Sequence, residues 1–453
     1  MRAFLDHTKC LPLFVKQIVP LLGSSPKGFF RFDGLRLYGR ISEGSTCPVY
    51  SDELPDVSSV VSDRNGSIAL PFSPSEVIDN LRLERYVGAM KRSGASLSGH
   101  ESTFRSVYYA LRLLLPVSVR SILQRIALRN CTRIPFPAWP VDMTVEGLIE
   151  ELWILALRSS GHAQIPFIWY WPKGFKGCAI MTHDVETSAG QDLCLAMLSL
   201  EQEYGIRSSF ELIPEVRYEI SEDIVRSIRQ AGGEICIHGL NHDGRLFSSE
   251  MEFRARAKAI NKHAQKWGAK GFRSPIMYRN VKWYDALSFS YDMSVPNVAH
   301  LDSQHGGCCT VFPYFCGDVL ELPLTTTQDY SLYNILRSDP MAMWTKQVDM
   351  ILAKSGLVSF IIHPDYTMRS EKQDLYRRLL RLLKQCSEER DVWLALPGEV
   401  DSWWRARNSM TLAWEAGTWA VRGKGSERAT VAYATLKDDK LAYSFHNENV
   451  NEI

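Results

Sequence analysis

The second half of the chain alternates short apolar stretches with longer amphipathic ones. Between about residues 175 and 400, the apolar runs predict strands and the segments with helical spacing predict helices. Repeated strand–helix units imply a parallel sheet covered by helices, and seven or eight units favour a closed β/α barrel over an open sheet. The predicted strands are GCAIMTH, RSSFELIP, EICIHG, GFRSP, YDMSVP, VLELPL, LVSFIIHP and VWLALP, and the predicted helices are 189–204, 221–231, 249–268, 341–354 and 371–387.

The two ends of the chain have different patterns. The stretch GLRLYGRIS alternates like a strand and is followed by a long polar loop. After residue 400 the alternation returns, with turn signals at Gly417, GKGS and KDDK, which predicts antiparallel strands. We therefore expect an N-terminal accessory region of mixed α/β structure at 1–150, a barrel at 151–400 and a small β module at 401–453.

A basic stretch at residues 104–133 holds six arginines and no acidic residue, with apolar residues at helical spacing and a break before Pro116. One hypothesis is a helical hairpin that docks on the neighbouring domain and leaves its arginines in water. The other is a basic amphipathic surface near anionic lipid or a phosphorylated substrate. We favour the docked hairpin and keep peripheral membrane contact as the alternative.

Composition narrows the class of protein. The 453 residues have a net charge of +1, which argues against a nucleic-acid footprint over the whole molecule. The ten cysteines are scattered without a CxxC pair, so we expect buried, reduced thiols. Asp6, Lys9 and Lys16 interrupt the apolar N-terminus, which is a poor signal peptide. We expect a cytoplasmic location.

Polar side chains recur where the predicted strands end. Active sites on β/α barrels lie at the carboxyl ends of the strands, so these side chains are candidates for chemistry. Each one alone has an ordinary structural explanation, but together they favour an active site. The candidates at the strand ends are Asp184, Glu186, His238, His242, Arg273, Asp292, His363 and Asp365.

The segment IHGLNHDG is the strongest local signal. His238 and His242 are four residues apart, and in a helical turn both imidazoles point to one side, as metal chelation needs. Two hydrogen-bonded histidines are the structural alternative. A carboxylate from another strand end would complete a site for zinc or another divalent ion that acts as a Lewis acid.

The segment THDVE supplies two candidate carboxylates. Because strand side chains alternate, Asp184 and Glu186 are expected on the same face, and one can bind the metal while the other acts as general base. Arg273 could keep that base ionised, and His363 could protonate a leaving amine. His183 points to the opposite face and is expected to be structural.

The ordered set of motifs resembles the polysaccharide deacetylase family, also called the NodB-homology or carbohydrate esterase family 4 fold. THDVE, HGLNH, RSP, YDMS and SFIIH are similar to its five motifs, over about half of the chain at residues 175–400. The resemblance implies a distorted β/α barrel, removal of N- or O-acyl groups from sugars, and a divalent metal that is often zinc.

Carried over residue by residue, the resemblance also implies roles. Glu186 is offset by one position from the usual second acid, so Asp184 is the alternative metal ligand. Asp292 stands in the fourth motif without the tryptophan usual there. The implied roles are general base for Asp184, metal ligands for Glu186, His238 and His242, orientation of the base for Arg273, catalysis for Asp292 and general acid for His363.

The expected function is therefore a metal-dependent deacetylase, a hydrolase of non-peptide C–N bonds. Its expected substrate is an acylated sugar of a glycan or of a nucleotide- or lipid-linked glycan precursor, and no nucleic-acid partner is expected. One alternative is a hydrolase of a small C–N compound on the same fold. Another is an inactive carbohydrate-binding barrel. The oligomeric state is left open.

Overall fold

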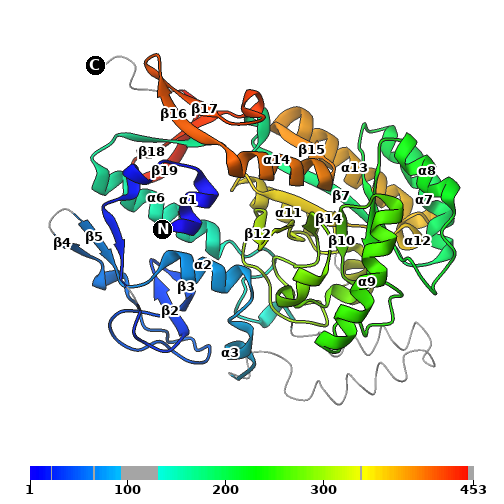
Figure 1. The fold of residues 1–453 in the computed structure, drawn as a ribbon, viewed down its shortest axis with the longest axis horizontal. Coiled ribbons are helices and arrows are strands. Elements are labelled where there is room, and N and C mark those ends of the chain that lie inside the picture. The colour runs from blue at the N-terminus through cyan, green and yellow to red at the C-terminus, as the bar shows by residue number, and fades with distance from the viewer. Residues whose placement is uncertain (22, 65–66, 93–130, 337–338, 447–453) are drawn as a thin grey trace. The chain divides into compact units, whose positions relative to one another are not determined.

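The computed structural model covers residues 1–453 and describes all of them except 22, 65–66, 93–130, 337–338 and 447–453 (Figure 1). The basic stretch predicted at 104–133 lies outside the described residues apart from the short 3-10 helix Cys131–Arg133, so both hypotheses for it stay predictions. The chain divides into two compact units. Unit 1 comprises Met1–Ser96, Met143–Phe175 and Ser402–Ile453, and unit 2 comprises Leu97–Asp142 and Lys176–Asp401.

Unit 2 is built on one nine-stranded sheet that carries the strand–helix alternation of the sequence. Its strands run parallel except for β12, which is antiparallel to β13. The order is β12-β13-β11-β10-β9-β8-β7-β14, and β15 also pairs with β7. The predicted α/β class, a distorted barrel, is confirmed as a curled and mostly parallel sheet. The strands are β7 (Gly177–Val185), β8 (Ser209–Leu212), β9 (Glu234–His238), β10 (Gly271–Arg273), β11 (Tyr291–Asp292), β12 (Tyr314–Cys316), β13 (Val319–Glu321), β14 (Leu357–Ile361) and β15 (Val392–Ala395).

Strand β7 organises this sheet because it has three strand partners. All nine of its residues are buried. One edge pairs with β14 from Cys178 to Thr182. The other edge pairs with β15 from Gly177 to Ile180 and then with β8 from Thr182 to Val185. The apolar first half of β7 is therefore enclosed on both edges, and its polar second half reaches the carboxyl end of the sheet.

The outer edge of β14 is bordered by the segment that follows β13. The hydroxyls of Thr325 and Thr326 donate to Leu357 O at 2.8 Å and to Ser359 O at 2.7 Å. The backbone of Ser359 donates to Thr325 Oγ1 at 2.9 Å and accepts from Thr326 N at 3.3 Å. The threonine hydroxyls thus form hydrogen bonds with backbone groups of β14 that a neighbouring strand would pair with in a regular sheet. Among the described strands, β13 and β14 do not pair directly, so the sheet curls without a complete ladder.

Helices cover the outer surface of the sheet at the positions that the sequence predicts (Figure 1). The side chains of Thr187 and Ser249 cap two of them by accepting from Gly190 N and Glu252 N. Their apolar faces meet outward-facing strand residues such as Phe210 in one core. No helix in the described part of the chain is long and apolar enough to cross a membrane. The helices are α7 (Ser188–Gln202), α8 (Glu222–Gln230), α9 (Glu250–Trp267), α11 (Pro340–Leu352) and α13 (Ser370–Arg390).

Unit 1 combines segments from the start, the middle and the end of the chain. The antiparallel strands predicted after residue 400 are confirmed as two hairpins, β16–β17 and β18–β19, and β18 also pairs with β6. The N-terminal part adds a β2–β3 hairpin and the sheet β1-β5-β4. The elements are α1 (Arg2–Thr8), β1 (Ile18–Pro20), β2 (Gly28–Phe32), β3 (Leu35–Gly39), β4 (Ser62–Arg64), β5 (Ser67–Leu70), α2 (Pro74–Arg82), α3 (Val87–Arg92), α6 (Thr144–Ser160), β6 (Gln164–Ile168), β16 (Thr411–Glu415), β17 (Thr418–Arg422), β18 (Val431–Lys437) and β19 (Lys440–Ser444).

A buried arginine joins three of these segments of unit 1. Arg407, near the end of α14 (Pro397–Ser409), donates from Nε to Trp169 O at 2.9 Å and from Nη2 to Ile168 O at 2.6 Å. Nη2 also reaches His7 O at 2.9 Å, at the end of α1. Burial lowers the pKa of Arg407 to about 10. The backbone carbonyls satisfy a charge that would otherwise be costly to bury.

Candidate metal centre

The end of β7 presents two carboxylates to the same region. Asp184 Oδ2 and Glu186 Oε1 each lie 3.8 Å from His238 Nε2, as expected from the alternation along the strand. His183 faces the other way, and its Nε2 lies 2.6 Å from Glu201 Oε1 of α7. Burial would lower the pKa of His183, but the Glu201 carboxylate raises it above its usual value. The outward placement predicted for His183 is therefore observed.

The two histidines converge through a sharp turn rather than a helix. His238 ends β9, and the segment that follows contains Gly239 at φ 62° and His242 at φ 54°. The segment does not form the helical turn considered for this motif, because these left-handed residues reverse the chain. A Cβ at Gly239 would lie 2.3 Å from Pro275 Cγ, so the close approach requires glycine. The turn leaves the two imidazole centroids 5.1 Å apart.

Glu186, His238 and His242 form the group of described residues that could hold a metal ion, with ligand atoms within 4.8 Å of one another. Glu186 Oε1 lies 3.0 Å from His242 Nε2. Both Nε2 atoms are buried and make no hydrogen bond in the structure, which fits lone pairs that face a shared cation. Two imidazoles and one carboxylate suit zinc and other divalent ions. Burial would raise the pKa of Glu186, but His242 and the other nearby histidines hold it well below its usual range.

Asp184 is paired with a buried arginine. Its Oδ1 lies 3.4 Å from Arg273 Nη1, at the end of β10. Arg273 is fully buried, and its Nη2 donates to Thr182 Oγ1 at 2.9 Å. Burial would raise the pKa of Asp184, but the Arg273 guanidinium keeps it below its usual value. Asp184 is therefore an ionised carboxylate beside the possible metal site.

His363, just past β14, is paired with an acid that sequence reasoning did not select. Its Nδ1 lies 2.7 Å from Asp329 Oδ1, and its backbone N–H donates to Asp329 Oδ2 at 2.8 Å. Its Nε2 lies 3.7 Å from Glu186 Oε1. Burial would lower the pKa of His363, but Asp329 raises it well above its usual value. Asp329 therefore favours the protonated form of His363, whose Nε2 faces the Glu186 carboxylate.

Asp329 has a weak signal in the sequence because it does not directly follow a predicted strand. It lies eight residues beyond β13, after the threonines that border β14. Searching the loops after each strand for an unassigned acid would have included Asp329. Only the fold shows that Asp329 faces His363.

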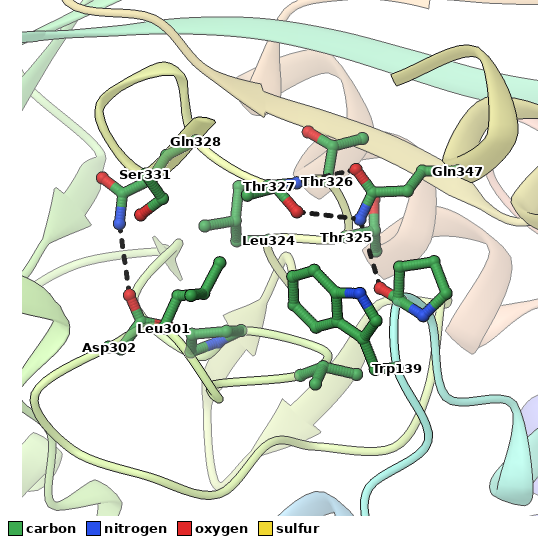
Figure 2. A pocket seen from close by; sticks show the side chains of 13 residues that line it. Trp139, Leu301, Asp302, Leu324, Thr325, Thr326, Thr327, Gln328, Ser331 and Gln347 are labelled. Carbon is green, nitrogen blue, oxygen red and sulfur yellow. Dashed lines mark hydrogen bonds between the residues drawn. The ribbon is translucent and has the colours of Figure 1, made fainter. Parts of the chain in front are cut away.

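The segment that carries Asp329 is braced beside a small pocket (Figure 2). Thr327 N donates to Gln347 Oε1 at 3.0 Å, and Gln347 Nε2 donates back to Thr327 Oγ1 at 3.1 Å. On the other side, Gln328 Nε2 donates to Asp302 Oδ1 at 3.1 Å. These bonds fix the backbone immediately before Asp329. Apolar lining is supplied by Trp139, Leu301 and Leu324.

Asp292 is the one candidate that the structure does not bring to this cluster. It ends β11 opposite Glu321 of β13, and Ser294 Oγ donates to its Oδ1 at 2.6 Å. The next residue, Met293, faces Arg273, with Sδ 3.6 Å from Nη2. Alternation therefore directs the Asp292 carboxylate away from the interior that holds Arg273. Its predicted catalytic role gains no support from its contacts.

Asp292 and Glu321 instead form a buried carboxyl pair. Both side chains are about 1% exposed. Burial and the Asp292 carboxylate raise the pKa of Glu321 well above its usual value, and burial raises that of Asp292. Val295 N donates to Glu321 Oε1 at 2.9 Å. Two buried carboxyl groups on paired strands are costly to ionise together, so we expect them to share a proton.

Comparison with known proteins gives a structural similarity alone. No protein-family model matches the chain, and no curated protein matches its sequence. Over about half of the chain, the fold is similar to solved polysaccharide deacetylases of carbohydrate esterase family 4. A candidate deacetylase from Mycobacterium smegmatis is 19% identical, with a TM-score of 0.45 over 53% of this chain and 94% of its own.

Two further structures differ in activity. The peptidoglycan deacetylase PdaC from Bacillus subtilis is 13% identical, with a TM-score of 0.33 over 51% of this chain and 94% of its own. A pseudoenzyme of the same family from Bacillus anthracis is 16% identical, with a TM-score of 0.32 over 51% of this chain and 66% of its own. The similarity therefore does not separate a catalyst from an inactive relative.

Metal binding tests which carboxylate completes the triad. We expect the purified protein to bind one equivalent of Zn²⁺ in calorimetry. Glu186→Gln and His242→Ala should each weaken binding by about 100-fold or more, because a ligand is lost. The matched variant Asp184→Asn should retain most of the affinity. If Asp184→Asn abolishes binding and Glu186→Gln does not, the assignment is reversed.

The carboxyl pair predicts a pH dependence of stability. The folded pKa of Glu321 lies above the unfolded value near 4.5, so stability falls as pH rises from that value. Glu321→Gln keeps an acceptor for Val295 and supplies an N–H for Asp292. We expect this variant to match the wild type at pH 4 and to exceed its stability at pH 8 by roughly 1 kcal/mol or more. Urea midpoints measure this, and the exposed Glu222→Gln is the control. Parallel pH curves for Glu321→Gln and the wild type would contradict the shared proton.

Proposed function

We propose that this protein is a metal-dependent deacetylase that hydrolyses an N-acetyl or O-acyl group on a sugar. The observation that carries the proposal is the convergence of three groups at the carboxyl ends of β7, β9, β10 and β14. These groups are the triad that could bind a metal, the Asp184–Arg273 pair and the His363–Asp329 pair. Each supplies one requirement of acyl transfer to water.

The triad would hold a divalent ion, for which we favour zinc. Such an ion supplies Lewis-acid chemistry, which polarises an acyl carbonyl and makes water a better nucleophile at neutral pH. His238 Nδ1 lies 3.2 Å from Arg273 O, so this carbonyl can fix the ring with Nε2 directed at the ion. The triad contributes three ligands, which leaves room for substrate and water.

Asp184 would act as the general base. It is ionised, it lies next to the triad, and Arg273 holds it in one orientation. A carboxylate in this position can accept the proton of the attacking water. Arg273 lowers the basicity of Asp184, but it also prevents the carboxylate from being neutralised by burial.

His363 would act as the general acid. Its protonated ring can donate from Nε2 to the leaving amine or alcohol, while Asp329 holds Nδ1–H. Asp329 is therefore a positioning residue that also keeps the imidazolium charged. The division between an ionised base and a protonated acid at the same pH follows from their different charge partners.

Acetate release tests the proposed reaction. We expect the zinc-loaded protein to release acetate from N-acetylated sugars, tested with chito-oligosaccharides, N-acetylmuramic acid and N-acetylglucosamine 1-phosphate. His238→Ala should lower the rate by about 100-fold or more, and exposed His162→Ala should not change it. Release from a small cyclic amide instead would support the alternative C–N hydrolase. Metal and sugar binding without any release would support an inactive barrel.

Asp329→Asn tests the acid pair separately. Asparagine can still accept from His363 Nδ1 but carries no charge. We expect kcat to fall by roughly 10²-fold with little change in KM. Because an acid must be protonated, activity is lost as pH rises through its pKa, and losing Asp329 should move that loss to lower pH. An unchanged pH profile would contradict the role of Asp329.

A further inference from the structure

We propose that Arg217 binds an anionic group of the substrate, so that the acyl group is removed from a sugar that carries a phosphate or a carboxylate. This inference rests on the proposed deacetylase function and specifies its substrate class. It comes from the loop at residues 213–218, which follows β8 and borders the triad.

The loop is anchored to the end of β7 and to the segment that follows β9. The hydroxyl of Tyr218 donates to Val185 O at 2.5 Å, next to Glu186, and accepts from Ile213 N at 3.2 Å. Glu215 N donates to the carbonyl of Leu240, between the two histidines of the triad, at 2.9 Å. The backbone on both sides of Arg217 is therefore fixed relative to the site.

The tip of the loop is strained and exposed. Val216 has φ 74° and is 84% exposed, an unusual combination for a β-branched apolar residue. Strain of this kind persists where the surrounding structure holds it, and it is often found at ligand-binding sites. The anchors at Glu215 and Tyr218 are the contacts that hold it here.

Arg217 brings an exposed positive charge to the edge of the triad. Its Nη2 lies 3.3 Å from His242 Nδ1, and no carboxylate pairs with it among the described residues. Several other surface arginines of unit 2 have acidic partners, for example Arg254 with Asp285 and Arg377 with Glu203. Arg217 is thus available for an anion supplied by a ligand.

The contact between Arg217 and His242 also favours an anionic ligand at this position. A metal at Nε2 takes that lone pair, so the ring hydrogen must be on Nδ1. His238 has an acceptor for this hydrogen in Arg273 O at 3.2 Å, whereas His242 Nδ1 faces the Arg217 guanidinium, which is also a donor. Two donors that face each other are stabilised by an oxygen acceptor that lies within reach of both. An anionic oxygen of the substrate satisfies both.

The position of Arg217 limits where that oxygen can be. Arg217 Nη2 contacts Nδ1 of the His242 ring, and Nε2 of the same ring lies 3.0 Å from Glu186 Oε1 in the triad. The anionic group therefore belongs to the acylated sugar itself or is bonded directly to it. Arginine recognises phosphate and carboxylate through the same planar pair of donors, so both sources share this chemistry.

Binding measurements test the inference apart from turnover. Zinc-loaded full-length protein with His363→Ala is titrated in a calorimeter with N-acetylglucosamine, N-acetylglucosamine 1-phosphate and N-acetylmuramic acid. We expect at least one anionic sugar to bind roughly tenfold or more tightly than the neutral sugar. The phosphate and the carboxylate arms identify which source is preferred.

A second substitution, added to His363→Ala, shows whether Arg217 causes the preference for anionic sugars. Adding Arg217→Ala should reduce it to within about twofold, and Arg217→Lys should keep part of it, because the charge remains without the planar fork. The matched control is Arg226→Ala, an exposed arginine of α8 that pairs with Asp223 at 3.2 Å. Equal affinities for neutral and anionic sugars, or a preference that survives Arg217→Ala, would overturn the inference.

The two proposals fail in different ways. Acetate release from sugars without any preference for the anionic ones overturns the role of Arg217 and leaves deacetylation intact. Arg217-dependent binding of anionic sugars without acetate release overturns deacetylation and keeps the binding role. If none of the sugars binds or reacts, both proposals are overturned.

Discussion

Charge balance among buried groups is the constraint on which the candidate site depends. Asp184 and Asp329 are almost completely buried, and the Glu186 side chain is only 20% exposed. A buried carboxylate is costly unless a positive partner offsets its desolvation. Arg273 balances Asp184, and His363 balances Asp329, which leaves Glu186 between imidazoles. A metal cation bound by the triad, as we propose, would complete this balance.

The lateral pairing of β7 explains why these charges meet at all. Its neighbours β8 and β14 are parallel to it, so their carboxyl ends reach the same edge of the sheet. His363 follows β14, and the Arg217 loop follows β8. The proposed base, the proposed acid and the proposed anion-binding arginine therefore come from adjacent strands although they are far apart in the sequence. Contacts made by the loops after these strands then fix where the side chains lie.

Much of the framework follows from local sequence patterns. The helices lie within a few residues of their predicted bounds, because apolar periodicity and capping residues are local signals. The shared face of Asp184 and Glu186 follows from strand alternation alone. Asp292 shows the limit of this reasoning, because its strand-end position resembles the others while alternation turns it toward Glu321. In a strand of only two residues, such as β11, the sequence pattern is too short to predict which face of the sheet each side chain occupies.

The sequence by itself determined the class of the fold, the alternation of its parallel strands and helices, and the residue types that could bind a metal or move protons. These properties depend on near neighbours along the chain. Only the tertiary structure decided that His242 approaches Glu186 through a left-handed turn, that Asp329 supports His363, and that Arg217 borders the triad. Those relations join separate loops, and loop conformation is set by long-range contacts that no local pattern encodes.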